Sequence, residues 1–210
     1  MLKNGIKSDI IIKINDFPLI TYQKEIPLMQ SIQEFEKKIK RVLVTKEEID
    51  AAIKEAGKKI DALYDGRPIL LVSILKGAFV FMADLCRAIT VPCEVGFMCA
   101  KSYYKGTVST GIVQITMDLE QDISKYHVVI AEDIVDTART LYDIVKLLKA
   151  RNPLSLTVVT LLDKPSGRVV DYNPDISLFT IPNHFVIGYG LDCGEYFRNL
   201  PYVAEYNTEE

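Results

Sequence analysis

Two adjacent acidic residues, Glu132 and Asp133, follow an apolar run at 127–131, and a polar segment at 136–140 comes soon after them. The apolar run predicts a buried strand, and the apolar spacing beyond residue 140 predicts a helix. The amino end of a helix offers free backbone amides and the positive end of its dipole, which favour a phosphate group. Carboxylates can accept hydrogen bonds from the vicinal hydroxyls of a sugar. The segment could therefore hold a ribose 5-phosphate unit.

A simpler interpretation assigns the same segment a purely structural role. Asp136 or Thr137 could cap the following helix, while Glu132 and Asp133 are solvated. This interpretation does not explain why Glu132 and Asp133 both come directly after the strand. Taken alone, the segment leaves both interpretations open.

Polar residues follow two other predicted strands as well. Lys76 and Gly77 come after the apolar run at 69–74, and Lys164 comes after the run at 156–162. Ligands of open α/β sheets bind beyond the carboxyl ends of the strands. We therefore expect the three segments to converge at one edge of a sheet, although Lys76 alone could be an ordinary surface lysine.

Strands and helices that would position these segments alternate along the chain from residue 44. Thr45 and Glu48 have the spacing of a capping box, and an apolar stripe with helical spacing follows at residues 49, 53, 56 and 60. Further strands are expected at 93–99, 113–117 and 176–181, the first two forming an antiparallel pair with a long connection. A helix after Gly77 should bury Phe79, Met82, Ala83 and Cys86. This order predicts an α/β fold with parallel βαβ units.

The composition describes an ordinary globular chain. Of 210 residues, 49% are hydrophobic and 25% charged, and the net charge of −3 does not indicate nucleic-acid or membrane binding. The four cysteines lack metal-ligand spacing, and no apolar stretch approaches the length of a membrane span or a signal peptide. We expect reduced thiols and a cytoplasmic location. Residues 1–40 are interpreted as an N-terminal extension of uncertain structure, and 41–210 as one domain.

Four segments resemble motifs of one enzyme family, in the same order along residues 41–203. Residues 129–140 resemble the phosphoribosyl-pyrophosphate-binding motif of type I phosphoribosyltransferases. Within that group, 73–79 are similar to the pyrophosphate loop of the hypoxanthine-guanine phosphoribosyltransferases, and 102–111 to their flexible catalytic loop. Lys164 with 185–198 resembles their purine pocket and C-terminal hood. The resemblance implies a mostly parallel twisted sheet flanked by helices, with a small hood and a flexible antiparallel loop.

The resemblance also implies a reaction, in which a 6-oxopurine displaces pyrophosphate from phosphoribosyl pyrophosphate with Mg²⁺ in purine salvage. Asp136 would be the general base at purine N7. Ribose and phosphate binding is implied for Glu132, Asp133, Thr137, Ala138, Arg139 and Thr140. Pyrophosphate binding is implied for Leu75, Lys76, Gly77, Ser102, Tyr103 and Arg198. Purine binding is implied for Lys164, Phe185, Val186 and Asp192, and metal binding for Asp192, Glu132 and Asp133.

Several finer expectations accompany these roles. The peptide bond between Leu75 and Lys76 should be cis, as is common in the family. Lys164 has donors only, so it suits a purine carbonyl and would repel a 6-amino group. Phe185 would stack on the base, although it could instead be ordinary strand-end packing. Ala138 stands where the family usually has glycine, and an alanine fits there only if its φ is negative. Arg139 replaces the usual lysine.

Other functions remain possible at this stage. A relative of the same fold could be a catalytically silent nucleotide sensor, or it could transfer another base such as adenine or orotate. The presence of Asp136, Lys164 and Asp192 argues against a silent protein, and Lys164 argues against adenine. The expected partners are the two small-molecule substrates and a second copy of the chain in a homodimer or homotetramer, with no nucleic acid and no membrane.

Overall fold

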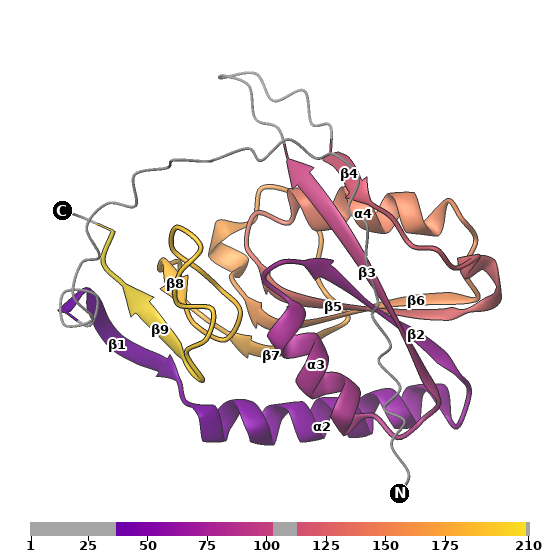
Figure 1. Cartoon of the computed structure of the whole chain (residues 1–210), viewed down its shortest axis with the longest axis horizontal. Helices are drawn as coiled ribbons and strands as arrows, with labels where there is room; N and C mark the ends of the chain where they lie inside the picture. The colour runs from indigo at the N-terminus through magenta and orange to yellow at the C-terminus, as the bar shows by residue number, and fades with distance from the viewer. Residues whose placement is uncertain (1–36, 103–112, 209–210) are drawn as a thin grey trace, which may run out of the picture.

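A six-stranded sheet forms the centre of the protein (Figure 1). The computed structural model describes residues 37–102 and 113–208, with the side chains of 101 and 102 excepted. The strand order is β4-β3-β2-β5-β6-β7, and β4 alone runs antiparallel to its neighbour. The strands are β2 (Ile69–Leu75), β3 (Cys93–Ser102), β4 (Val113–Met117), β5 (His127–Val135), β6 (Ser155–Asp163) and β7 (Ile176–Thr180). The predicted α/β class and the mostly parallel sheet are confirmed.

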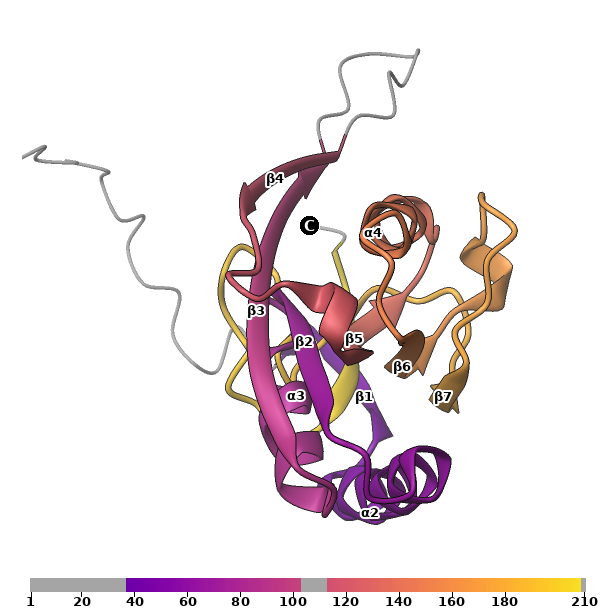
Figure 2. The ribbon, with the colours of Figure 1, turned by 90° about the vertical axis from the view of Figure 1, so that its right-hand side faces the viewer.

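Helices cover both faces of this sheet (Figure 2). α2 (Lys46–Tyr64) and α3 (Phe79–Ala88) pack on one face, and α4 (Arg139–Lys149) packs on the other. Successive strand residues point to opposite faces, so both faces of the central strands are apolar. In β2, Ile69 and Leu71 pack in the same core as α2 and α3, whereas Leu70 and Val72 pack in the core of α4. Each such fully buried side chain contributes roughly 1.5–3 kcal/mol to stability.

The first helix begins as the sequence predicts. Thr45 Oγ1 accepts from the Glu48 amide at 3.3 Å, and Glu48 Oε2 accepts from the Thr45 amide at 2.8 Å. The capping box is therefore confirmed, and the predicted stripe at 49, 53, 56 and 60 is buried.

The buried face predicted for α3 is partly wrong. The helix buries Phe81, Met82 and Leu85, whereas Phe79 is 43% exposed. Ala83 is also exposed, and Cys86 is only half-buried. Because nearly every position of this helix is apolar, the spacing of its apolar residues selects no single face.

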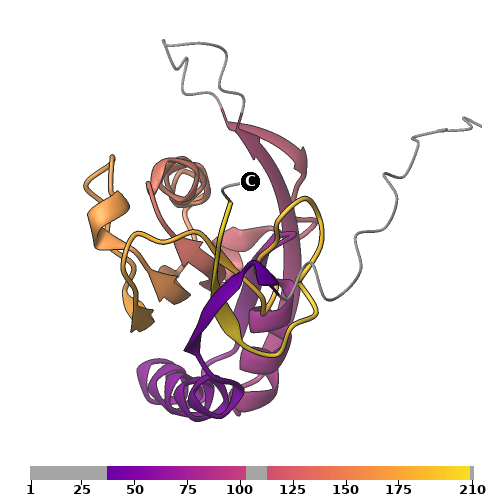
Figure 3. The same ribbon diagram turned by 90° about the vertical axis from the view of Figure 1, so that its left-hand side faces the viewer.

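A second, smaller sheet forms a hood at the carboxyl edge of the large one (Figure 3). It joins β1 (Ile39–Val44), β9 (Val203–Tyr206) and β8 (Val186–Ile187) in the order β1-β9-β8, all antiparallel. The hood thus combines the first described residues of the chain with the last. β1 begins inside the segment interpreted as the N-terminal extension, of which residues 1–36 lie outside the described part. No helix among the described residues is long and apolar enough to cross a membrane.

The end of β5 differs from the sequence-based expectation. β5 was expected to end at residue 131, but it continues to Val135, so Glu132 and Asp133 lie within the strand. β2 pairs with β5 only as far as the pair Ser73 and Ala131. Beyond that pair β5 is held by β6 alone, through Val135 and its partner Asp163 among others. Since β2 turns away there, no strand of the described part of the chain borders one edge of the last residues of β5.

Candidate functional site

Two crowded carboxylates mark the part of β5 that β2 leaves uncovered. Glu132 Oε2 is buried and has no hydrogen-bond partner in the described chain. Burial, and then the charge of Asp133, raise the pKa of Glu132 well above its usual range. Burial also raises the pKa of Asp133 to about 6, although the Ile134 amide donates to Asp133 Oδ1 at 2.8 Å. Acids held in this way favour a positively charged ligand.

The loop from β5 to α4 encloses a pocket of about 240 Å³ lined by residues 132–141. The N-cap residue of α4 is Ala138, and its side chain makes no capping hydrogen bond. The interpretation that Asp136 or Thr137 merely caps this helix is therefore wrong. The first turn of α4 lines the pocket, and its N-cap residue supplies no capping side chain, an arrangement that suits an anion site. Arg139 and Thr140 are the first two residues of α4, and Thr137 is exposed beside them.

Ala138 has a left-handed backbone. Its φ is +62°, whereas we expected that an alanine would fit only with a negative φ. That expectation is wrong, because the tight turn into α4 imposes the conformation that glycine adopts most easily. The alanine is accommodated at a cost of roughly 1–2 kcal/mol.

Asp136 and Lys164 form an ion pair at the mouth of this loop. Lys164 Nζ donates to Asp136 Oδ2 at 2.9 Å, and the Lys164 side chain is almost fully buried. The Lys164 amide donates to the Val135 carbonyl at 3.0 Å, which ties the end of β6 to the end of β5. Gly167 lies so close that a Cβ there would be 2.0 Å from Asp136 Oδ1. A glycine is therefore needed at 167 to leave room for the carboxylate.

Arg168 stabilises the backbone around Asp136, and the sequence analysis did not single it out. Its Nη1 donates to the carbonyls of Val135 at 2.5 Å and of Asp136 at 2.6 Å. Its Nη2 pairs with Asp163, and its Nε donates to the Tyr172 carbonyl at 2.9 Å. The guanidinium fork thus fixes the backbone that carries Asp136. An arginine four residues after Lys164, beyond a Pro-Ser-Gly turn, was the signal available in the sequence.

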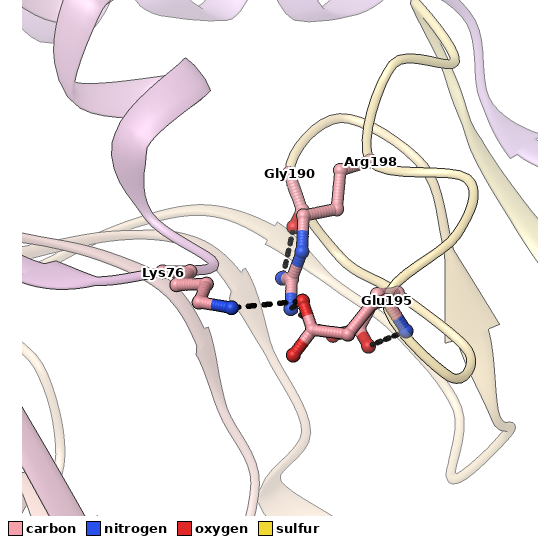
Figure 4. A network of polar contacts seen from close by, with 5 residues as sticks. Lys76, Gly190, Glu195 and Arg198 are labelled. Carbon is pink, nitrogen blue, oxygen red and sulfur yellow. Dashed lines mark hydrogen bonds and ion pairs between the residues drawn. The ribbon is translucent and has the colours of Figure 1, made fainter. Parts of the chain in front are cut away.

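The loop after β2 meets the hood in a network of charged side chains (Figure 4). The Leu75–Lys76 peptide bond is cis, as predicted. Gly77 lies against Asp133, since a Cβ at 77 would be 1.6 Å from Asp133 Oδ2. From the hood, Arg198 Nη2 lies 2.8 Å from Asp192 Oδ1, and Arg198 Nη1 donates to the Gly190 carbonyl at 2.8 Å. The structure therefore brings the segments of Lys76 and Asp133 together, as the topology predicted, and Arg198 of the hood joins them.

Glu195 is the second residue of this site that the sequence analysis gave no separate role. Its Oε2 accepts from Lys76 Nζ at 3.1 Å and from Arg198 Nη2 at 3.1 Å. The hydrogen bond from Lys76, and to a smaller extent that from Arg198, holds the pKa of Glu195 below its usual range. Its amide donates to Asp192 Oδ2 at 2.9 Å. A carboxylate thus bridges the two cations to which pyrophosphate binding was assigned.

Phe185 and Val186, which were also expected to bind the purine, lie beside and on the hood sheet. Phe185 is 45% exposed, so it is not a buried core residue. One of its neighbours is Tyr206, with ring centroids 6.4 Å apart. Val186 is buried and pairs with Glu205 of β9. Ser102 ends β3 opposite Val113, whereas its side chain and Tyr103 lie outside the described residues.

The carboxylates at the carboxyl edge of the sheet suit a hard cation that is bound partly by the protein and partly by a substrate. Within residues 37–102 and 113–208, no group of three potential ligands is arranged to hold a metal ion by itself. Glu132 nevertheless has an unpartnered buried oxygen, and the charges of Arg198 and Asp192 both act on Asp133. Mg²⁺ is commonly bound by one or two carboxylates together with substrate phosphates. The residues present therefore fit Mg²⁺ as a cation that completes its shell with the ligand.

Comparison with known proteins adds independent information. Residues 39–193 match the family model described as phosphoribosyl transferase domain. The chain is 46% identical over 174 residues to the hypoxanthine-guanine phosphoribosyltransferase of Streptococcus pneumoniae R6, which covers 83% of this chain and 97% of the relative. It is 43% identical over 167 residues to the hypoxanthine phosphoribosyltransferase of Buchnera aphidicola, covering 79% and 94%. The crystal structure of a hypoxanthine phosphoribosyltransferase from Staphylococcus aureus superposes with a TM-score of 0.80 at 43% identity, covering 85% and 96%.

Proposed function

Because the chain belongs to the phosphoribosyl transferase family and has its type I fold, we propose that it is a purine salvage enzyme. It joins hypoxanthine, and also guanine, to the ribose 5-phosphate unit of phosphoribosyl pyrophosphate. The relatives named for hypoxanthine or guanine transfer support this substrate class.

The ion pair between Asp136 and Lys164 is the observation that carries the proposal. A 6-oxopurine with a proton on N7 presents a donor at N7 beside an acceptor at O6. A carboxylate and an ammonium 2.9 Å apart offer the complementary acceptor and donor. An adenine would place a 6-amino group against the ammonium of Lys164, which has no acceptor. The pair therefore favours 6-oxopurines over 6-aminopurines.

The residues of the site then act as follows. Glu132 and Asp133 accept from the ribose hydroxyls, while the amides from Ala138 to Thr140 hold the 5′-phosphate. Purine N9 bonds to C1′ as the bond from C1′ to the pyrophosphate oxygen breaks. Asp136 takes the proton from N7, and Lys164 donates to O6. The two residues thus remove a proton and stabilise the oxygen on the same edge of the base.

The leaving pyrophosphate needs positive charge around it. We assign Lys76, Gly77 and Arg198 to this group, with Leu75 shaping the loop and Ser102 and Tyr103 closing over it. Glu132, Asp133 and Asp192 would hold Mg²⁺, which supplies charge neutralisation of the pyrophosphate when bound. Phe185 stacks on the base, and the backbone of Val186 meets its edge.

A substrate panel tests this function directly. We expect nucleotide formation from hypoxanthine and guanine with phosphoribosyl pyrophosphate and MgCl₂, and none from adenine. Asp136→Asn should lower kcat about 10²–10⁴-fold with little change in donor KM. Asp171→Asn, at an exposed position outside the site, is the matched control. Absence of product with every base would refute the enzyme assignment, and full activity of the Asp136 variant would remove that residue from the base role.

The homodimer or homotetramer remains part of the proposal, together with a cytoplasmic location. Phe79, Val95, Phe97 and Met117 are 40–43% exposed and lie on β3, its neighbour β4 and the start of α3. Covering these side chains with a second copy would remove them from water. Sedimentation of the protein and of Phe97→Asp tests the idea, since a monomeric wild type would contradict it.

A further inference from the structure

We propose that Glu195 is a displaceable internal anion that occupies the pyrophosphate position of the site, so that it weakens the binding of pyrophosphate and eases its release. The inference rests on the proposed function, because it takes Lys76 and Arg198 as the cations that hold pyrophosphate.

The contacts of Glu195 are those that a bound phosphate oxygen would make. One carboxylate oxygen accepts from Lys76 Nζ and from Arg198 Nη2, each at 3.1 Å. The two cations come from different parts of the chain, the loop after β2 and the hood, and Glu195 lies between them in Figure 4. Pyrophosphate that bridges the same two cations must replace this carboxylate, because the two anions cannot share the donors without strong repulsion.

The surroundings allow such an exchange. The backbone of Glu195 is fixed in a turn with φ +75° after Gly194, and its amide donates to Asp192. Its side chain, by contrast, is 63% exposed, and that of Lys76 is 66% exposed. An exposed ion pair of this kind is weak and is easily exchanged for a more highly charged partner. The carboxylate can therefore rotate toward the solvent while the backbone turn that carries it stays in place.

Arg198 is held in the site by contacts other than the one with Glu195. Its Nη1 donates to the Gly190 carbonyl and its Nη2 pairs with Asp192, so the guanidinium stays in the site when Glu195 leaves. Its Nε is buried without a partner among the described residues. Displacement of Glu195 thus exposes an arginine that is already in place, beside the lysine that Glu195 releases.

The test is titration calorimetry of the full chain with inorganic pyrophosphate and MgCl₂. Glu195→Gln keeps the shape of the side chain and removes its charge, so we expect about fivefold tighter pyrophosphate binding from the loss of two weak ion pairs. Glu55→Gln is the matched control, because Glu55 is 64% exposed and pairs with Lys58 on α2, outside the site. The control should bind pyrophosphate as the wild type does. Product inhibition by pyrophosphate should strengthen by the same factor in Glu195→Gln alone.

Unchanged or weaker pyrophosphate binding by Glu195→Gln would overturn the inference, and weaker binding would make Glu195 a residue that positions Arg198. An equal gain in Glu55→Gln would also overturn it, because the effect would then come from net charge. If the wild type binds no pyrophosphate and forms no nucleotide, the proposed function itself fails. That result is distinct from a wild type that binds pyrophosphate while Glu195→Gln gains nothing.

Discussion

Replacing Asp133 with asparagine should stabilise the protein at pH 7.5 in the absence of metal. Burial raises the pKa of this carboxyl to about 6, against an ordinary value near 3.9. Raising the pKa from about 3.9 to about 6 corresponds to about 3 kcal/mol, and partial access to water reduces the expected gain to about 1–3 kcal/mol. Asparagine keeps an oxygen that can accept from the Ile134 amide, so the substitution removes the charge with little loss of hydrogen bonding.

The sign of the pH dependence follows from the raised pKa. Between pH 4 and 6 the folded protein binds a proton at Asp133 that the unfolded chain has lost. The contribution of this group to stability is therefore present below about pH 4 and is lost as the pH rises through about 6. The advantage of the asparagine variant should be small at pH 4.5 and complete at pH 7.5.

Thermal unfolding in EDTA at these two pH values measures the effect. For a chain of this length 1 kcal/mol corresponds to about 2–4 °C, so Asp133→Asn should raise Tm by roughly 2–12 °C at pH 7.5. Asp171→Asn controls for the change in net charge. MgCl₂ should raise the Tm of the wild type more than that of Asp133→Asn, because a cation relieves the same cost.

Two results would refute this reasoning. Equal Tm values for Asp133→Asn and the wild type at pH 7.5 would show that the ionised carboxylate costs nothing where it lies. A gain of the same size at pH 4.5 and pH 7.5 would show that the effect does not come from ionisation.

Three further substitutions test the backbone around the pocket. Ala138→Gly should raise the free energy of unfolding by about 1 kcal/mol in urea denaturation, because the φ of +62° disfavours alanine. Gly167→Ala should lower kcat at least about tenfold with donor KM nearly unchanged in steady-state kinetics, since the added methyl meets the Asp136 carboxylate. Arg168→Lys should lower the free energy of unfolding by about 2 kcal/mol and also lower kcat, since lysine cannot bond Asp163 and two carbonyls at once. A stable, fully active Arg168→Lys would contradict the positioning role.

Local chemistry made much of the fold predictable from sequence. The capping box at Thr45 depends on residues three positions apart, and strands such as β2 are apolar at nearly every position, which only a sheet covered on both faces buries. Alternation of strand and helix then led to a parallel sheet and to convergence of the segments at 76, 132–140 and 164 at one edge. The ion pair between Asp136 and Lys164 confirms that convergence.

Features that depend on contacts across the fold were not predictable in this way. β5 continues through Glu132 and Asp133 because β6 still pairs with it beyond the last residue that pairs with β2. The local sequence contains no signal of where the pairing with β2 ends. Arg168 acts on backbone carbonyls more than 30 positions away. Glu195 acquires its role only from a lysine that is 119 positions distant. The face of α3 was likewise decided by packing, because its own sequence is apolar almost throughout.

Charged groups that we assign to the substrates have partners within the chain. Lys164 is paired with Asp136, and Lys76 and Arg198 are paired with Glu195. On the proposed function, each partner matches what the substrate would offer, so binding exchanges one set of ion pairs for another and its net free energy stays moderate. Glu132, with its unpartnered oxygen, is different because neither Lys76 nor Arg198 pairs with it. A cation bound at this edge of the sheet would relieve the cost of the buried charge, which would couple the binding of metal and substrate there.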